Sequence, residues 1–175
     1  MSIVIADLYG LGGLTTSPGM LTLADKIKAL GESFIVLGPY DQDDWQQAAD
    51  DLGKRPNGDQ IGAVGYSLGA NNIVEVATAI SRKIEFVAGI QPSYWGLGVD
   101  WQGSITLPAN VGAALCIYNP YFVATFGLGY ARYAAPARFP GTLKVVVTND
   151  LHPDADNDAG IHGLILRGLQ TVVEK

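Results

Sequence analysis

Six short apolar runs, each rich in β-branched residues, constrain the fold of this chain more than any other feature. The runs lack strict alternation of apolar and polar residues, which is typical of strands buried on both faces of a parallel sheet. They lie at Ile3–Leu8, Phe34–Leu37, Ile61–Gly65, Phe86–Ile90, Ala113–Tyr118 and Leu143–Thr148.

Helical patterns separate several of these runs. Ser17-Pro18 is a helix-start signal, and the apolar spacing that follows it ends at Gly31. Asp43–Leu52 is a polar helix candidate. Two further apolar stripes follow Ser67 and lead to the C-terminus, at Ile73, Val76, Ala77 and Ile80, and at Ile161, Leu164, Ile165, Leu169 and Val172. The alternation predicts an α/β fold with a mainly parallel sheet of about six strands and helices on both faces.

The composition is that of one globular domain. Hydrophobic residues make up 48% and charged residues 16% of the 175 residues, enough to fill a core. No linker, repeat or low-complexity tract interrupts the chain, so we expect a single domain over residues 1–175.

Charge and hydropathy exclude several kinds of partner. The formal net charge is −6, and no basic stripe is present to bind nucleic-acid phosphates or anionic lipid. The N-terminus has no basic lead-in and soon reaches Asp7, and no window approaches ~18 uninterrupted apolar residues. We therefore expect neither a signal peptide nor a membrane span, and a cytoplasmic location. The lone Cys116 lies in an apolar run and is interpreted as a small buried hydrophobe.

The segment Gly65-Tyr66-Ser67-Leu68-Gly69 carries the most chemical information. It reads G-x-S-x-G directly after a predicted strand and before a predicted helix. In that context the serine lies on a strained turn with its hydroxyl above the sheet, and glycines are needed where backbones crowd the turn. Ser67 is therefore the predicted nucleophile, and the helix that follows it favours negative charge at the site.

A second glycine-rich loop, Leu8-Tyr9-Gly10-Leu11-Gly12-Gly13, follows the first predicted strand. Acyl transfer needs N–H donors for the oxyanion of its tetrahedral intermediate. We predict these donors to be the backbone N–H groups of Leu11 and Leu68. The alternative, a phosphate-binding loop, is disfavoured because the segment lacks the P-loop Lys-Ser/Thr and does not match G-x-G-x-x-G.

With these two segments the chain resembles the α/β-hydrolase superfamily, specifically its small lipase, esterase and thioesterase-like members. LYGLGG stands where many members have a strand that ends in His-Gly-x-Gly-Gly, with Tyr9 in place of that histidine, and GYSLGA matches the nucleophile elbow. The resemblance extends over nearly the whole chain. It implies a compact α/β-hydrolase fold, a serine nucleophile, a small-molecule acyl substrate and no cofactor.

The general base must be one of only two histidines, His152 and His162. Both follow the last predicted strand, where the family places its base after the serine. Position favours His152, in the loop beyond the strand tip. His162 is the alternative base; otherwise it caps the C-terminal helix or lines the cleft.

The catalytic acid is where the sequence departs from the family pattern. The family usually has Asp or Glu after the strand that precedes the last one, and Asn119 occupies that position here. Asp100, in the loop after the preceding strand, is a second possibility, and Asp150 paired with His162 is a third. Asp154, Asp156 and Asp158 are further candidates.

Two other features have weaker functional interpretations. The spacing Asp154-x-Asp156-x-Asp158 is that of a calcium loop, but Ala159 and Ile165 replace the expected glycine and glutamate, so no metal site is predicted. Two stretches without clear periodicity are expected to be long connections that help line an acyl or aromatic pocket, with aromatic residues at Tyr94, Trp95, Trp101, Tyr121, Phe122, Phe126, Tyr130 and Tyr133.

The sequence therefore predicts a serine hydrolase that cleaves an ester or thioester through an acyl-enzyme on Ser67. Two alternatives are open: a binding module on the same fold whose triad has decayed at Asn119, and an acyltransferase that uses the same nucleophile.

Overall fold

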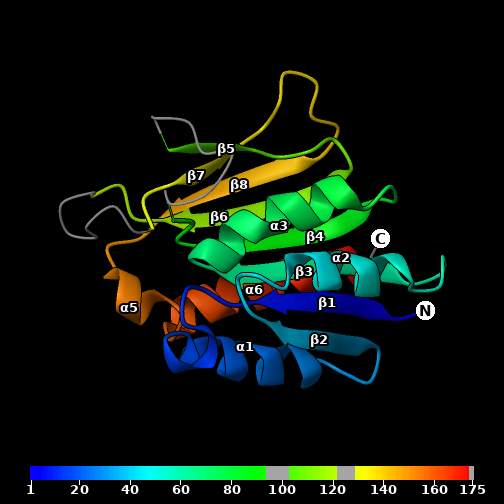
Figure 1. Ribbon diagram of the computed structural model, residues 1–175, viewed down its shortest axis with the longest axis horizontal. Coiled ribbons are helices and arrows are strands. Elements are labelled where there is room, and N and C mark those ends of the chain that lie inside the picture. The colour runs from blue at the N-terminus through cyan, green and yellow to red at the C-terminus, as the bar shows by residue number, and fades with distance from the viewer. Residues whose placement is uncertain (94–102, 122–128, 174–175) are drawn as a thin grey trace.

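The computed structural model describes residues 1–93, 103–121 and 129–173. A six-stranded, wholly parallel sheet runs through the molecule in the order β2-β1-β3-β4-β6-β8 (Figure 1). Each strand coincides with one of the six predicted runs to within three residues at either end. The strands are β1 (Ile3–Leu8), β2 (Phe34–Tyr40), β3 (Gln60–Tyr66), β4 (Ile84–Ile90), β6 (Val111–Tyr118) and β8 (Thr142–Val147).

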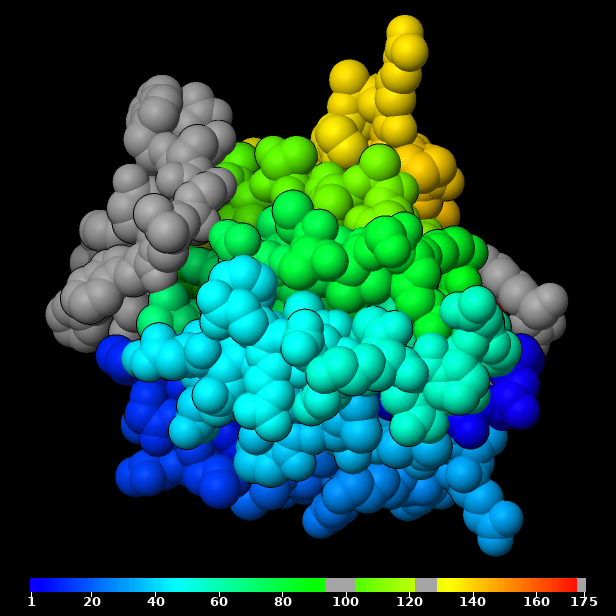
Figure 2. Space-filling model, turned by 45° about the vertical axis from the view of Figure 1, so that its right-hand side comes forward, coloured from blue at the N-terminus to red at the C-terminus, as the bar shows by residue number. Residues whose placement is uncertain are grey.

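Helices cover both faces of the sheet, as the alternation predicts. One face packs against α1 (Pro18–Lys28) and α6 (Ala159–Val173), and the other against α2 (Trp45–Gly53) and α3 (Leu68–Ala79). Figure 2 shows α2 (cyan) and α3 (green) side by side on the second face. Each layer buries an apolar cluster against the strands, so the sheet has a core on both sides.

The expectation of strands buried on both faces is correct for the interior of the sheet and wrong for its edges. All six residues of β1 are buried, whereas most of the outer strand β8 is exposed or half-buried. Val145 and Val147 of β8 are 42% and 56% exposed. An edge strand has a neighbour on one side only, so its side chains receive less cover.

Two short strands occupy stretches that were expected to be irregular. β5 (Ser104–Thr106) and β7 (Arg132–Ala134) form a separate parallel pair. Tyr133 of β7 is buried, and its hydroxyl donates to the carbonyl of Ala70 at 2.5 Å. Among the aromatic residues of these stretches, Tyr133 therefore belongs to the core beneath α3.

The carboxyl ends of the parallel strands meet at one edge of the sheet, and the segments that follow them gather there. At this edge lie the 3-10 turn η1 (Gly13–Thr15), the start of α3 and the short helix α5 (His152–Ala155), which is orange in Figure 1. Among the described helices, none combines the length and the apolar character that crossing a bilayer requires.

Candidate active site

Ser67 lies in the sharp turn between β3 and α3, in a strained backbone conformation. Its φ and ψ are 57° and −120°, and a positive φ is uncommon for a residue with a side chain. The turn is held by the Ser67 N–H, which donates to the carbonyl of Ile90 at 3.0 Å. A Cβ on Gly69 would lie 2.3 Å from the carbonyl oxygen of Leu8, and one on Gly65 would lie 2.6 Å from that of Gly69. The turn therefore requires both glycines of G-x-S-x-G.

His152 is brought to this serine by the segment after β8. Its Nε2 lies 2.9 Å from Ser67 Oγ, although the residues are 85 positions apart. The ring stacks on Tyr66, with centroids 4.9 Å apart and planes at 25°, and the Tyr66 hydroxyl donates to the carbonyl of His152. The residue before the nucleophile thus holds both the ring and the backbone of the histidine.

The other imidazole nitrogen contacts an amide, not a carboxylate. Gln91, directly after β4, places Oε1 3.0 Å from His152 Nδ1, and its Nε2 donates to the carbonyl of Asp150 at 2.8 Å. Gln91 has a φ of 44°, so the described residues with a side chain and a positive φ are Ser67 and Gln91. A Cβ on Gly129 would lie 2.7 Å from His152 Nδ1, so only glycine leaves room for this contact. Gln91 was not predicted from the sequence, because the family pattern indicates an acid as the partner of the base.

A second hydroxyl, also missed, contacts the nucleophile. Ser93 Oγ lies 2.8 Å from Ser67 Oγ and is fully buried. Its backbone is fixed independently: the Ser93 N–H donates to the carbonyl of Ser67 at 3.3 Å, and Asn71 Nδ2 donates to the carbonyl of Ser93. The sequence carries no signal for this contact, because serine is common on loops.

Burial sets the protonation state of the histidine. His152 is 7% exposed, and this burial lowers its pKa to about 4. The imidazole is therefore neutral near pH 7 and can accept a proton from Ser67. A carboxylate at Nδ1 would oppose this shift, whereas the Gln91 amide carries no charge.

Among the described residues, no predicted acid forms a hydrogen bond with the His152 ring, whose partners are Gln91 and Ser67. Asn119 Nδ2 donates to the carbonyl of Asp150 at 3.0 Å, and its Oδ1 accepts from the N–H of Tyr121 at 2.8 Å. The Asp150 carboxylate accepts from the Thr148 hydroxyl, and Asp154 is exposed on α5. Asp100 lies outside the described residues.

The alternative base, His162, contacts a different part of the molecule. It lies in α6, with Nδ1 2.9 Å from Lys26 Nζ and Nε2 2.6 Å from the carbonyl of Asp156. Burial lowers its pKa, and the Lys26 charge adds to the shift. The Asp156 carboxylate accepts from the N–H of Gly19 at 2.8 Å, so this cluster joins α6 to the start of α1.

The glycine-rich loop after β1 passes against the nucleophile. A Cβ on Gly10 would lie 2.9 Å from Ser67 Cβ. The Gly10 N–H donates to Ser17 Oγ at 3.3 Å and is therefore already bonded. The next backbone N–H along this loop is that of Leu11. Leu11 is 56% exposed, and Leu68 is the first residue of α3. Both predicted oxyanion donors thus belong to segments that border Ser67.

Three of the eight aromatic residues expected to line a pocket belong to the described residues. Tyr94, Trp95, Trp101, Phe122 and Phe126 lie outside the described residues; Tyr121 is 60% exposed and Tyr130 is half-buried.

Burial raises the pKa of the Cys116 thiol to about 12, in keeping with its interpretation as a core residue. Within the described ranges, no three His, Cys, Asp or Glu side chains gather as a metal site would need.

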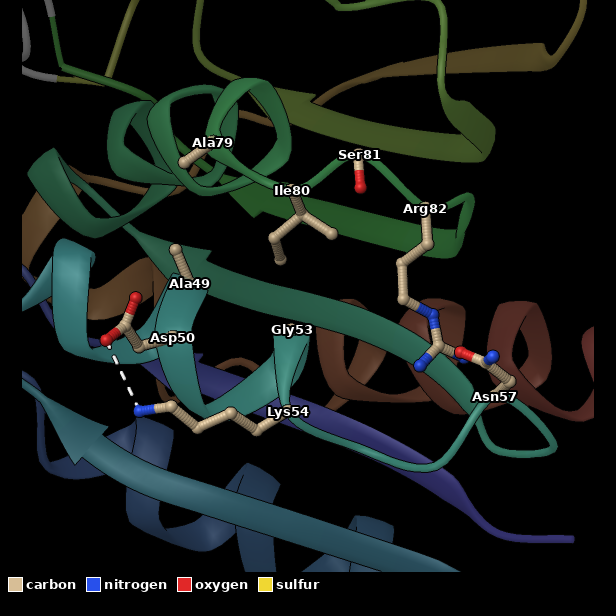
Figure 3. Close-up of a pocket in the computed structure, with 9 residues that line it drawn as sticks. All are labelled: Ala49, Asp50, Gly53, Lys54, Asn57, Ala79, Ile80, Ser81 and Arg82. Carbon is tan, nitrogen blue, oxygen red and sulfur yellow. Dashed lines mark hydrogen bonds and ion pairs between the residues drawn. The ribbon is translucent and has the colours of Figure 1, made fainter.

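A hollow of about 350 Å³ lies elsewhere, between the C-terminal ends of α2 and α3 (Figure 3). Its charged groups have structural partners. Lys54 Nζ is 3.3 Å from the Asp50 carboxylate, and Arg82 donates to backbone carbonyls, including that of Arg55 at 2.9 Å. These helix ends lead into the amino ends of β3 and β4, so the hollow lies at the opposite end of the strands from Ser67.

The chain has the α/β-hydrolase fold. A crystal structure of a Xanthomonas campestris protein described as an α/β serine hydrolase without a lid superposes with a TM-score of 0.59 at 17% identity, covering 96% of this chain and 81% of that one. Mouse α/β hydrolase domain-containing protein 10 gives 0.61 at 14% identity, over 98% and 89% of the two chains. Dienelactone hydrolase from Anabaena variabilis gives 0.57 at 13%, over 98% and 86%. No protein-family model and no curated protein matches the sequence.

Proposed function

We propose that the protein is a serine hydrolase that cleaves a carboxylic ester or thioester through an acyl-enzyme on Ser67. One observation carries the proposal: His152 Nε2 lies 2.9 Å from Ser67 Oγ while its Nδ1 is held 3.0 Å from Gln91. A nucleophile in contact with a base that a third group orients is the arrangement by which serine hydrolases activate a hydroxyl.

In this mechanism Ser67 Oγ attacks the substrate carbonyl as its proton passes to His152 Nε2. The N–H groups of Leu11 and Leu68 hold the oxyanion. His152 then gives its proton to the leaving group, and the acyl group stays on Ser67. In the second half of the reaction His152 takes a proton from a water molecule that attacks the acyl carbonyl, and it returns a proton to Ser67 Oγ as the acid departs. Small esterases, lipases and thioesterases of this fold share this reaction, and the proposed substrate is a small acyl compound.

Covalent labelling tests the nucleophile. A fluorophosphonate probe should label the wild type and not Ser67→Ala, and p-nitrophenyl acetate should be hydrolysed only by the wild type. Equal labelling of both proteins would remove Ser67 from the mechanism. No turnover of short esters, together with specific binding of acyl compounds, would favour the alternative of a non-catalytic binding module.

The two histidines provide the matched test of the base. His152→Ala should reduce kcat by at least about a hundredfold, the size expected when a general base is removed. His162→Gln, which changes the cluster beneath α1, should keep most of the activity of the folded protein, as circular dichroism can verify. The reverse pattern would make His162 the base. Transfer of the acyl group to an added alcohol in preference to water would instead indicate an acyltransferase.

A further inference from the structure

We propose that Ser93 is a catalytic residue whose hydroxyl donates a hydrogen bond to Ser67 Oγ and stabilises the charge that develops there during attack. The inference rests on the proposed function, because it assigns a role in the same reaction. The direction of this hydrogen bond follows from where the protons of His152 and Ser67 must lie, which the surrounding contacts determine.

The proton positions are fixed from the Asp150 carbonyl outward. This carbonyl can only accept, so the amide nitrogen of Gln91 faces it at 2.8 Å, and the amide oxygen of Gln91 faces His152. Nδ1 of His152 must then carry the proton, which leaves Nε2 as an acceptor for the hydroxyl of Ser67. Ser67 has only that one proton, so in its 2.8 Å contact with Ser93 the donor is Ser93. The opposite amide orientation would place two oxygens against each other.

The Ser93 hydroxyl can stabilise charge on the nucleophile because of where it lies. It is fully buried, and a hydrogen bond shielded from water strengthens most when its acceptor becomes charged. As the Oγ–C bond forms, the carbonyl π electrons move to the oxyanion and the Ser67 proton moves to His152. Ser93 keeps its own proton throughout, and it donates again when Oγ departs from the acyl group.

This donor acts on the nucleophile in a site where an amide, and not a carboxylate, contacts Nδ1 of the base. The Gln91 amide orients the imidazole without stabilising its positive charge. A hydrogen bond to Oγ makes the loss of the Ser67 proton easier from the other side. The two contacts therefore complement each other in a site whose base is weak.

The main-chain contacts of Ser93 make the test clean. The Ser93 N–H donates to the Ser67 carbonyl, and the Ser93 carbonyl accepts from the Asn71 side chain. Both bonds use only the backbone of Ser93, so Ser93→Ala removes the hydroxyl and leaves them in place. Ser93→Thr restores a hydroxyl. The measurement is inactivation by a fluorophosphonate, because fluoride leaves without protonation and the rate reports attack by Oγ alone.

We expect Ser93→Ala to lower the inactivation rate constant about 10- to 100-fold with unchanged probe binding, as one hydrogen bond to a developing charge predicts. Ser93→Thr should recover most of the rate, and mass spectrometry should find the adduct on Ser67. A rate for Ser93→Ala within twofold of the wild type would overturn the proposal. So would equal slowing in Ser93→Ala and Ser93→Thr, or an adduct on Ser93. A wild type that the probe does not label would instead contradict the proposed function itself.

Discussion

Gln91 gives His152 an acceptor without giving it a negative charge. The amide fixes the tautomer, because its own nitrogen is committed to the carbonyl of Asp150. Burial then lowers the pKa of His152 to about 4, and the partner of Nδ1 is an amide, which does not raise it again. The base works only when Nε2 is unprotonated, so activity is lost as the pH falls through this pKa. We expect kcat/KM to be level from about pH 5.5 to 8 and to decline only near pH 4.

Gln91→Glu should move this acidic limb upward by at least about one pH unit, because a carboxylate at Nδ1 stabilises the imidazolium. Asn119→Asp is the matched control. It also removes a donor to the Asp150 carbonyl and adds a carboxylate, but Asn119 does not contact His152. pH profiles of p-nitrophenyl acetate hydrolysis measure both. An equal shift in the two variants, or a wild-type limb near the ordinary histidine pKa of about 6.5, would contradict this assignment.

The sequence predicts the pair at the centre of the site and misses the groups around it. Ser67 and His152, which the structure brings within 2.9 Å of each other, were predicted because G-x-S-x-G follows a strand and only two histidines exist. Gln91 and Ser93 carry no such signal, since glutamine and serine are common on loops. Their roles depend on a backbone φ of 44° and on the position of β4 beside β3, and both are properties of the folded chain.

At the scale of elements, the start of α1 illustrates how a local signal is overridden. Ser17-Pro18 correctly marks the position, but the Ser17 hydroxyl accepts from Gly10 instead of capping the helix. The cap is the Asp156 carboxylate, which accepts from the Gly19 N–H. No periodicity in the sequence links α1 to a loop near the C-terminus, so this contact was not predictable. The strands, by contrast, were predictable because each one is a short apolar run rich in β-branched residues.

Gly19→Ala should therefore disturb both stability and catalysis. A Cβ there would lie 2.1 Å from the carbonyl oxygen of Asp156, which is backbone and cannot rotate away. Overpacking of this kind costs about 1–3 kcal/mol in the free energy of unfolding. The displaced segment begins four residues after His152, so we also expect kcat to fall in the folded protein. Urea denaturation and p-nitrophenyl acetate hydrolysis provide the two readouts.

Gly53→Ala is the control glycine. It is the last residue of α2, and a Cβ there meets nothing within 4 Å. Alanine should leave activity unchanged and raise the free energy of unfolding by up to about 1 kcal/mol, because alanine favours helix. Similar loss of stability in both variants would show that the contact between α1 and Asp156 is not the cause.

The candidate site lies at the carboxyl ends of the strands of a sheet whose interior is mainly apolar. Ser67, Gln91 and His152 follow three different strands, β3, β4 and β8, and only the parallel order of those strands brings them together. The same sheet contains one polar exception in its interior. Asp7 of β1 is 2% exposed and lies on the face that also buries Ile5 and Tyr9.

Burial raises the pKa of Asp7 to about 8, against smaller opposing effects from the Tyr9 hydroxyl and the Lys28 charge. Between the unfolded pKa of about 3.9 and this value, the folded state holds a proton that the unfolded state has lost. The contribution of Asp7 to the free energy of unfolding must then fall as the pH rises from 4 to 8. At about 1.4 kcal/mol per pKa unit, the full loss is at most about 6 kcal/mol.

Asp7→Asn removes this titration from the molecule. The variant and the wild type should have similar free energies of unfolding near pH 4, where both side chains are neutral. The variant should gain by roughly 2 kcal/mol or more at pH 8, with most of the gain appearing between those values. Urea denaturation at several pH values measures the difference, in which all other titrating groups cancel. A difference that does not change with pH would mean that Asp7 is ionised in the folded protein and that the sheet stabilises its charge.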